Sequence, residues 1–578
     1  MAKRWVVRQC DEGLVGHLAR CLEISPITAQ VLIHRGVHSA EAARMFLQPQ
    51  LSQLSEPDLL PDLDAAVSRI CRAVTSKERI LVYGDYDADG VTATALLLQF
   101  FRQLGVRADY YIPHRVEEGY GLTLESVKAV ARRGVDLMIT VDCGVTAMKE
   151  IAAARAAGID VVVTDHHEPG VELPPAVAVV NPKLTGARVG FRELSGVGVV
   201  FKLIWALAKA LSPDSSGRVS ETVRKFLLDA VALVALGTIA DVVPLLGENR
   251  VLARYGLQAL PRSSNLGVQA LLEVSALAGK TLTEHNVAFG LAPRLNAAGR
   301  LSDARLGVEL LTTDSAATAL ELARRLDRHN RERQKMQERT LESARQMIQD
   351  DPVLADSSAL VLFSPEWHPG VIGVVASRLA EEYSRPVVLI AVDRGKGKGS
   401  ARSVPGLHLY EAIDRCRDLL ESCGGHAGAA GLRIDAERIP EFRERFVDVA
   451  SEMMGQRGMQ PTLEIDADVH LWMLSRRVVD ELACLAPFGE SNPAPVLAAS
   501  HLKIAGEPRL LGSAGKHLSF VVRQGDTSFR AVAFSMGELY EALCDANGSC
   551  AVAFEPQVNR FNGSESIELR VHDVRLTD

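Results

Sequence analysis

The chain has 578 residues, 64 of them basic and 72 acidic, which gives a net charge of −8. This length predicts about two to four domains, and 47% hydrophobic residues are enough for large cores. The negative charge excludes a protein that coats nucleic acid with its whole surface, but it does not exclude a local basic groove. None of the nine cysteines forms a C-x-x-C pair, which argues against a zinc ribbon or a disulfide framework and predicts a reducing, cytoplasmic location.

The sequence shows no sign of export or membrane insertion. The first twenty residues are charged throughout and lack the apolar core of a signal peptide. Lys202 interrupts the apolar stretch 197–211, and Asp241 interrupts the stretch 231–246. Neither stretch reaches the roughly 18–20 clean apolar residues that a membrane span needs. We therefore expect no membrane association, and because nothing argues for an oligomer we expect a monomer.

Residues 1–70 are expected to form a helical N-terminal region. Apolar residues recur at helical spacing in 27–37 and 39–48, and Ser39 is a candidate N-cap for the second segment. Residues 54–61 are expected to form a loop. We expect this region to pack against the rest of the chain or to guide DNA, and to carry no chemistry.

The stretch 80–94 (ILVYGDYDADGVTAT) is the most informative part of the sequence. A short apolar run predicts a buried strand, and Asp85, Asp87 and Asp89 follow it at alternate positions before an apolar helix. Crowded carboxylates repel one another and lose solvation unless a cation lies among them, and hard oxygen ligands suit Mg²⁺ or Mn²⁺. A solvated acidic turn or an Asp N-cap explains the pattern about equally well. An EF-hand is disfavoured, because apolar residues occupy the places of its later ligands.

Residues 71–310 alternate strands with helices, which predicts right-handed βαβ units and a mostly parallel sheet. Ligands of such sheets bind at the carboxyl ends of the strands. The expected strands are 80–84, 108–112, 137–142, 161–164 and 177–181, and the expected helices are 91–104, 124–133 and 146–157.

Acids or histidines stand at four of the expected strand or helix ends, of which the first is the strand at 80–84 with its three aspartates. The strand at 137–142 ends in Asp142, the strand at 161–164 is followed by Asp165, His166 and His167, and an apolar run ends at Asp241. Three of these four ends would converge on one edge of the sheet. Mixed Asp and His ligands suit Mn²⁺ or Mg²⁺ better than Ca²⁺. About six such ligands are enough for two ions, as in two-metal phosphoryl hydrolysis.

Four motifs carry a family resemblance at this point. GDYDADG, VDCG, TDHHEP and GTIADVVP resemble the ordered motifs of the DHH phosphoesterase superfamily, which is named for its Asp-His-His. The second half extends the resemblance to nearly the whole chain. Within the superfamily, the length and C-terminal layout look like those of bacterial single-strand-specific 5′→3′ DNA exonucleases.

The resemblance implies two metal ions with one shared ligand. Asp87 and Asp142 would hold the first ion. The second would be held by Asp89, Asp142, His166 and Asp241, so that Asp142 bridges the pair. Both ions would be Mn²⁺ or Mg²⁺.

Three neighbouring residues have less direct implied roles. Asp85 stands where related phosphatases have a histidine ligand, and it would bind the first ion directly or through water. His167 would face the scissile phosphate and stabilise its charge. Asp165 would orient His166 from outside the ligand shell, or else would cap a helix.

Two later segments are candidates for phosphate contacts. The glycines of 194–211 would either cradle a phosphate at a helix N-terminus or, as we favour, allow close helix packing. The segment 289–304 (FGLAPRLNAAGRLSDA) resembles one that lines the active-site entrance of these exonucleases. Arg294, Asn296 and Arg300 are therefore candidates for phosphate contacts, and an ion pair with the nearby aspartate is the alternative.

A long helix is expected to connect this domain to a second α/β domain. Residues 314–350 contain no Gly or Pro and would form one helix of about 55 Å, or two in line, within a connector at 311–352. The second domain, 353–455, contains GGHAGAAG and resembles the DHHA1 domain that accompanies DHH domains. Trp367 and His368 would stack on or line a nucleotide, with core packing equally expected for the tryptophan.

The resemblance also implies an anchor for the end of the substrate. Ser400, Arg402 and Ser403 offer hydrogen-bond donors suited to a phosphate. Together with Arg300 they would grip the terminal 5′-phosphate. His426 would approach the scissile phosphate across a cleft.

Residues 460–578 alternate in polarity and break at Gly, Asn and Asp, which predicts an all-β domain resembling an OB barrel. Such barrels hold single strands through aromatic and basic residues. Aromatic residues are few, so binding would be mostly electrostatic. The candidates are Lys516, His517, Arg523, Arg530, Phe534, Arg560 and Phe561.

The expected function is metal-dependent 5′→3′ hydrolysis of single-stranded DNA to 5′-mononucleotides, in DNA repair and recombination. A channel too narrow for a duplex would select single strands, and a helicase and a single-strand-binding protein would be partners. A DHH enzyme of small substrates is disfavoured by the chain's length and barrel. A catalytically silent DNA-binding scaffold is disfavoured because all expected ligands are present. Since the ligands must be ionised, activity should fall in acid.

Overall fold

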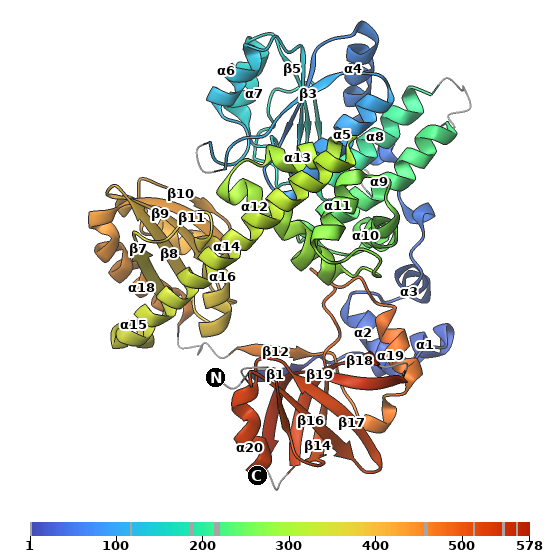
Figure 1. Cartoon of the computed structure of the whole chain (residues 1–578), viewed down its shortest axis with the longest axis vertical. Helices are drawn as coiled ribbons and strands as arrows, with labels where there is room; N and C mark the ends of the chain where they lie inside the picture. Colours follow the sequence, from blue (N-terminus) through green and yellow to red (C-terminus); the bar gives the residue numbers. More distant parts are fainter. Residues whose placement is uncertain are drawn as a thin grey trace. The chain divides into compact units, whose positions relative to one another are not determined.

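The structure, a computed structural model, consists of two compact units in which residues far apart in sequence come together (Figure 1). The first unit contains residues 1–56, 242–255 and 461–578, and the second contains residues 57–241 and 256–460. The residues that the structure describes are 3–115, 118–184, 190–212, 220–455, 461–512, 515–545, 549–561 and 564–577.

The second unit begins with a five-stranded, all-parallel sheet of order β3-β2-β4-β5-β6. The central strands consist of buried apolar residues, as expected for a parallel sheet covered on both faces. The predicted parallel sheet is confirmed. Its strands are β2 (Ile80–Gly84), β3 (Ala108–Tyr111), β4 (Leu137–Val141), β5 (Asp160–Thr164) and β6 (Ala178–Val180).

Helices cover both faces of this sheet. One face packs its apolar side chains against α6 and α7, and α4, α5 and α8 contact strands from the other side. The helices α9 and α13 in turn pack on α5. The bounds are α4 (Leu63–Ser76), α5 (Ala88–Gln103), α6 (Leu124–Ala131), α7 (Met148–Ala156), α8 (Gly196–Ala210), α9 (Glu221–Ala240) and α13 (Arg305–Thr312).

The predicted long helix forms as α14 (Ala316–Asp350), 35 residues without a break and about 52 Å long. Its N-cap, Ser315, accepts a hydrogen bond from the backbone N–H of Thr318 at 3.3 Å. Further helices pack on its first half. They are α11 (Leu266–Val274) and α12 (Ala292–Leu301), and α10 (Gly247–Ala259) precedes them.

A second α/β domain follows α14 and has a five-stranded mixed sheet of order β10-β11-β9-β8-β7. Its α16 covers one face over β7 and β8, and α17 and α18 cover the other. The strands are β7 (Leu360–Ser364), β8 (Val387–Asp393), β9 (Lys396–Arg402), β10 (Ser422–Gly425) and β11 (Ala429–Asp435). The helices are α15 (Pro352–Asp356), α16 (Ile372–Tyr383), α17 (Leu409–Asp414) and α18 (Ile439–Met454).

The first unit is built on a barrel. Its sheet has the order β13-β14-β18-β19-β17-β16-β15, and an additional pairing of β14 with β16 closes five strands into a ring. This is the predicted OB-like barrel. The strands are β13 (Ala467–Asp468), β14 (Leu497–Ile504), β15 (Arg509–Leu511), β16 (His517–Gln524), β17 (Thr527–Ala533), β18 (Ser549–Phe561) and β19 (Ser564–Thr577), with the helices α19 (Arg476–Ala483) and α20 (Tyr540–Asp545).

The sequence predicted a helical N-terminal region, but the structure shows that this region also contains a strand. β1 (Arg4–Val7) pairs in parallel with β12 (Thr462–Ile465), and a strand whose partner lies over 450 residues away has no local signal. Of the helices that follow, α2 and α3 contribute to the barrel-side core. Their bounds are α1 (Glu12–Leu22), α2 (Pro26–His34) and α3 (Ala40–Leu47).

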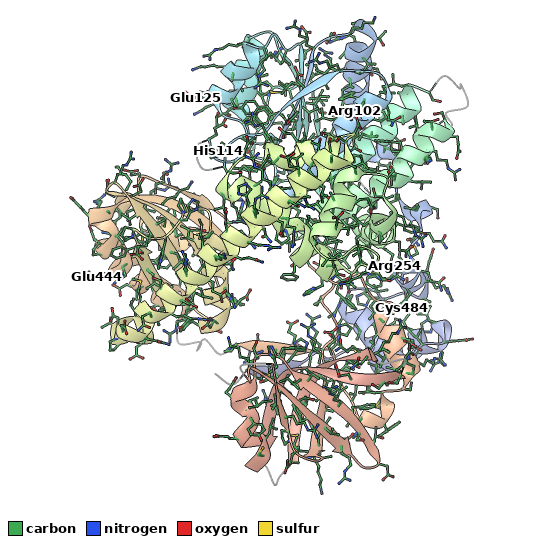
Figure 2. All side chains as sticks on the ribbon, in the orientation of Figure 1. Arg102, His114, Glu125, Arg254, Glu444 and Cys484 are labelled. Atoms are coloured by element: carbon green, nitrogen blue, oxygen red, sulfur yellow. The ribbon has the colours of Figure 1, made fainter. Side chains whose placement is uncertain are left out.

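Two expectations about the surroundings can be compared with the structure. All nine cysteines are free, and Cys484 is exposed (Figure 2), which agrees with the predicted lack of a disulfide framework. None of the helices in the described part of the chain has both the length and the hydropathy needed to cross a membrane.

Candidate metal centre and phosphate site

The predicted acids and histidines follow the carboxyl ends of β2, β4 and β5, except Asp241, which follows the carboxyl end of α9. β2 has β3 on one side and β4 on the other, so the strand order reverses here, at the kind of position where open α/β sheets bind ligands. Within each of three groups, one potential ligand atom per residue lies within 4.8 Å of the others. The groups are Asp85, Asp87 and Asp142; Asp89, His166 and Asp241; and Asp142, His166 and His167. We call the six residues Asp85, Asp87, Asp89, Asp142, His166 and Asp241 the acid–histidine cluster.

The turn after β2 is held by tight packing and by a cap. A Cβ on Gly84 would lie 2.0 Å from Thr94 Oγ1, so no larger residue fits at the strand's end. Asp87 is the N-cap of α5, and its Oδ1 accepts from the N–H groups of Asp89 at 3.0 Å and Gly90 at 3.1 Å. The N-cap interpretation is thus confirmed for one oxygen of Asp87, and it leaves the other oxygen for a cation.

Asp89 fills the N-terminus of α8. Its two oxygens accept from the N–H groups of Gly196 at 2.7 Å and Val197 at 3.0 Å, which are donors without partners inside the helix. A Cβ on Gly196 would lie 2.6 Å from Asp142 Oδ1. Close packing therefore explains this glycine, and the first turn of α8 holds a carboxylate of the chain where a bound phosphate was the alternative.

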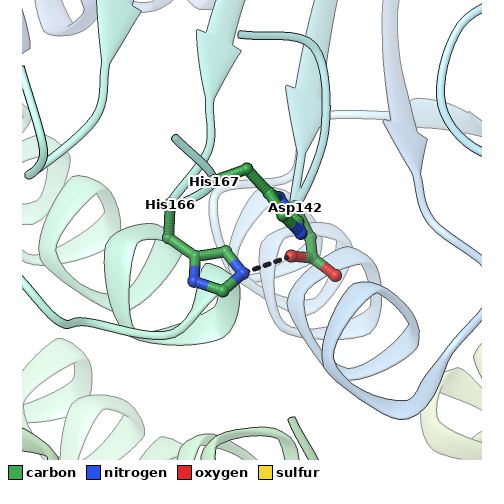
Figure 3. Close-up of side chains that lie close together, drawn as sticks. All are labelled: Asp142, His166 and His167. Carbon is green, nitrogen blue, oxygen red and sulfur yellow. Dashed lines mark ion pairs between the residues drawn. The ribbon is translucent and has the colours of Figure 1, made fainter. Parts of the chain in front are cut away.

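The side chains of Asp142 and His166 face each other (Figure 3). His166 makes a backbone hydrogen bond with Leu194, and burial together with His167 lowers the pKa of His166 to about 3, so its ring is neutral at pH 7. Its Nε2 lies 3.1 Å from Asp142 Oδ1 and 3.4 Å from Asp241 Oδ2, and none of these atoms has a hydrogen-bond partner. When both carboxyl groups are ionised, three lone pairs are directed at one another, and a cation among them would remove the repulsion.

Burial and mutual repulsion push the carboxyl groups of the cluster toward their neutral forms. Burial, then Asp89, raises the pKa of Asp142 well above its usual range, and burial, then Asp87, does the same for Asp85. The same two causes raise the pKa of Asp89 to about 7, and burial, then Asp89, raises that of Asp241 to about 9. The cluster therefore fits divalent cations, which would stabilise the ionised forms.

We predict that the metal-free protein loses stability as the pH rises. The folded-state pKa values of these acids lie above the unfolded value near 4, so their protonated forms favour the folded state, and this stability is lost up to about pH 9. Unfolding temperatures measured in EDTA should fall between pH 5 and pH 9. Excess Mn²⁺ should remove or reverse the fall, and an EDTA profile that rises over this range would contradict the prediction.

The structure corrects the expected partner of Asp165. Its Oδ1 accepts from His167 Nδ1 at 2.7 Å and from the N–H of His166 at 2.7 Å, and its Oδ2 accepts from the N–H of Val145 at 2.9 Å. Asp165 thus orients the ring of His167, because the ring of His166 turns away toward Leu194. No helix of the described chain begins at Asp165, so the capping alternative is wrong as well.

The surroundings of His167 favour its charged form. Burial opposes the charge, but the hydrogen bond and the charge of Asp165 outweigh it and raise the pKa of His167. The Tyr120 hydroxyl lies 3.0 Å from His167 Nδ1 and 3.2 Å from the carbonyl oxygen of Asp142. Tyr120 was missed in the sequence, and its only signal is a loop flanked by Gly119 and Gly121, both with positive φ.

Two of the predicted phosphate-binding residues are already occupied. Arg294 pairs with Asp327 at 2.9 Å and fastens α12 to α14, which corrects its predicted role. Asn296 Oδ1 accepts from the N–H of Ala88 at 2.7 Å, so it braces the first turn of α5 beside the cluster. The predicted alternative, an ion pair with Asp303, is wrong too, because Asp303 pairs with Arg305.

Arg300, Ser400 and Arg402 meet at the start of α16, and we call this group the arginine pocket. Arg300 Nη1 donates to the Gly370 carbonyl at 3.2 Å, and Arg402 Nε donates to Ser377 Oγ at 2.9 Å. α16 has no side-chain cap, which leaves its first N–H groups without a side-chain acceptor. A Cβ built on the first-turn glycine of α16, at position 373, would lie 2.9 Å from Ser400 Oγ and 3.4 Å from Arg402 Nη2.

The arginine pocket is electropositive. Burial, then Arg115 and Arg333, lowers the pKa of Arg300 to about 9, and burial, then Arg115, lowers that of Arg402. No carboxylate of the described chain forms an ion pair with any of these four arginines. Gathered cations beside an uncapped helix N-terminus form an anion site. Arg115 and Arg333 were missed, because Arg115 is the one arginine of a polar loop and Arg333 is one of many charged residues on the long helix.

Three other predicted residues are placed differently from the expectation or without a contact to the cluster. The Ser403 hydroxyl donates to the Leu407 carbonyl at 2.7 Å, so it is not free to donate to a phosphate. His426 is exposed in the turn between β10 and β11, and no described contact joins it to the acid–histidine cluster. His368 is half-buried and its Nδ1 accepts from the N–H of Gly370 at 3.0 Å.

For Trp367 the structure favours the core-packing alternative. The side chain is 5% exposed, packs in the core beneath α16, and donates to Ser343 Oγ of α14 at 3.3 Å. We expect Trp367→Ala to lower the free energy of unfolding by about 3–5 kcal/mol, as for other large core truncations. Denaturant unfolding would measure this, with His368→Ala as the half-buried control. A loss below about 1 kcal/mol would contradict the core assignment.

The predicted DNA-binding residues of the barrel lie on its surface. Lys516 and Arg523 are exposed. The other two arginines form ion pairs, Arg530 Nη1 with Glu568 Oε2 at 3.7 Å and Arg560 Nε with Glu565 Oε1 at 2.8 Å. Phe534 is 51% exposed and its ring meets that of His517 edge-on at 5.4 Å. The side chain of Phe561 lies outside the described residues.

Three protein-family models match the chain in the order that the sequence predicted. The DHH family N-terminal domain matches residues 79–238, the DHHA1 domain matches residues 356–452, and the RecJ OB domain matches residues 465–573. The predicted fold class and the DHH resemblance are therefore confirmed.

The chain also matches whole proteins. It is 37% identical over 577 residues to the single-stranded-DNA-specific exonuclease RecJ of Bacillus subtilis. The matched region covers 100% of this chain and 71% of that protein. Crystal structures of RecJ from Thermus thermophilus in complex with Mn²⁺ and with Mg²⁺ match with TM-scores of 0.83 and 0.76 at 35% and 34% identity. They cover 100% of this chain and 80% and 79% of those chains. The chain therefore belongs to the RecJ family.

Proposed function

We propose that this protein hydrolyses single-stranded DNA from the 5′ end, one nucleotide at a time, with two Mn²⁺ or Mg²⁺ ions in the acid–histidine cluster. The observation that carries the proposal is the convergence of the neutral His166 Nε2 with Asp142 Oδ1 and Asp241 Oδ2, an arrangement that a divalent cation would stabilise. The name of the Bacillus subtilis relative supports the substrate, and the Thermus thermophilus complexes support the choice of ions.

The ligand groups suit two neighbouring ions. Asp85, Asp87 and Asp142 would hold one ion, and Asp89, His166, Asp142 and Asp241 would hold the other. Asp142 belongs to two of the three groups of converging ligand atoms, which fits a bridge. Bound there, the ions would polarise the phosphoryl group and activate a water as the nucleophile.

The chain's own residues would position the substrate. His167, whose charged form Asp165 favours and which lies close to Tyr120, would hold the scissile phosphate through a charge-assisted hydrogen bond. The arginine pocket and the N-terminus of α16 would bind the terminal 5′-phosphate. With an end anchored there, hydrolysis would proceed in one direction only.

Further parts of the proposal rest on the family resemblance. His426 would approach the scissile phosphate, and the barrel would hold the incoming strand through Lys516 and Arg523. A helicase and a single-strand-binding protein would supply substrate in DNA repair and recombination. The protein would act as a monomer in the cytoplasm.

The test uses one single-stranded oligonucleotide labelled at the 5′ end in one sample and at the 3′ end in another. With Mn²⁺ or Mg²⁺, immediate release of labelled mononucleotide from the first and gradual shortening of the second would support the proposal. EDTA should stop both reactions. Turnover of di- to tetranucleotides alone would point to a small-substrate phosphodiesterase, and binding without turnover of either would point to a scaffold.

A further inference from the structure

The strand β9, which α16 contacts, carries a row of basic side chains on one face of the sheet in the second α/β domain. Successive residues of a strand point to opposite faces, so Lys396, Lys398, Ser400 and Arg402 of β9 share a face. The antiparallel register with β11 sets Arg433 directly opposite Lys398. The row therefore extends the arginine pocket toward the other end of β9.

A cavity of about 730 Å³ lies at this far end. Lys398 and Arg433 line it, together with the loop after β7, which includes Glu366, and the last residues of β8, which include Asp393. β7 and β8 run in parallel and their carboxyl ends meet at the cavity, at the edge where α/β sheets bind ligands. The volume falls within the range of small-molecule sites.

The cavity has two cations and two acids that form no ion pair with another described residue: Lys398 and Arg433, and Glu366 and Asp393. Lys396 pairs with both Glu421 and Asp435. No carboxylate of the described chain pairs with Lys398 or Arg433, and burial, then Arg433, lowers the pKa of Lys398. Two like charges directly opposite each other in a sheet are destabilising, so an anion between them would relieve a cost that the fold otherwise carries.

We propose that Lys398 and Arg433 bind a nucleotide phosphate in this cavity, as an anion site separate from the arginine pocket. Lys398 and Arg402 are four residues apart on β9, so their backbone positions are separated by about 13 Å at the usual rise. The exposed carboxylates of Glu366 and Asp393 would accept from amino or hydroxyl groups, which a nucleotide has and inorganic phosphate lacks.

This inference rests on the proposed function for the source of the nucleotide, which is either the released mononucleotide or the bound strand. Binding itself can be tested without catalysis, by calorimetry of the full chain in EDTA with deoxyadenosine monophosphate and with inorganic phosphate. The double variant Lys398→Ala/Arg433→Ala should bind the nucleotide about tenfold more weakly, since it loses charge-assisted hydrogen bonds.

Lys396→Ala is the matched control, because it truncates a lysine of the same cavity that is already paired. It should change the affinity by less than about twofold. Equal losses in the control and the double variant, or no loss in either, would overturn the proposal. Inorganic phosphate should bind the wild type more weakly than the nucleotide does. Equal affinities would contradict the proposed hydrogen bonds from the nucleotide to Glu366 and Asp393.

Kinetics with Mn²⁺ then distinguish the two sources. If the site holds the released product, the double variant should raise the inhibition constant of the mononucleotide about tenfold and leave KM for oligonucleotides unchanged. If it holds the strand, KM should rise only for oligonucleotides above a minimum length. If the wild type cleaves DNA and the double variant has the same inhibition constant for the mononucleotide and the same KM for oligonucleotides, the inference is refuted. A wild type that cleaves nothing would refute the proposed function alone, because calorimetry still decides the site.

Discussion

Asp142→Asn is expected to lower kcat at least about a thousandfold, roughly 4 kcal/mol of transition-state stabilisation, while leaving oligonucleotide binding within about threefold. The reason is that Asp142 is common to two groups of converging ligand atoms, and an amide cannot supply the negative charge that two cations share. The substitution keeps the size of the side chain, so the packing against Gly196 should survive. Rates with Mn²⁺ would measure the first effect, and calorimetric titration with the oligonucleotide would measure the second.

The same variant should behave in the opposite way without metal. Burial and Asp89 disfavour the ionised Asp142 in the folded state, so a neutral amide should raise the unfolding temperature in EDTA at pH 7. The wild type should gain about 2.7 kcal/mol from Mn²⁺ at a hundred times its Kd, and the variant should gain less. Asp109→Asn, on the exposed edge strand β3, is the control and should change neither readout. A variant that is less stable in EDTA would mean that Asp142 is held by hydrogen bonds and not by a cation.

The acid–histidine cluster was predictable because two simple rules combine. Strand propensity placed Asp85 and Asp142 after β2 and β4, and parallel topology then set both strand ends at the same edge. Side-chain direction within a turn follows no such rule. Asp165 could turn toward either histidine, and only the folded backbone directs His166 to Leu194 and leaves His167 to Asp165.

The errors concern contacts between residues distant in sequence. Arg294 meets Asp327 on α14, and Trp367 meets Ser343 on the same helix, and neither pairing has a local pattern. Arg115 is a similar case, because an isolated arginine in a polar loop gains meaning only where the fold sets it near Arg300 and Arg402. Sequence therefore predicted the chemistry of short motifs better than the tasks of single charged or aromatic residues.

Arg402→Ala is expected to remove the preference for a 5′-phosphorylated substrate. Arg402 lies beside the uncapped N-terminus of α16 with no carboxylate partner among the described residues, so its guanidinium is available for an anion. Loss of charge-assisted hydrogen bonds should lower kcat/KM for 5′-phosphorylated single strands by about 10- to 100-fold. Strands that end in a 5′-hydroxyl should be affected less than about threefold.

The conservative variant and a matched control separate phosphate binding from support of the fold. Arg402→Lys keeps the charge but not the fork of N–H donors, so it should recover part of the phosphate preference. Arg378→Ala removes an exposed arginine from the same helix and should leave the preference unchanged. If Arg402→Ala slowed both substrates equally while its unfolding temperature fell, the hydrogen bond from Arg402 to Ser377 would be its main task, and the 5′-phosphate would have to bind elsewhere.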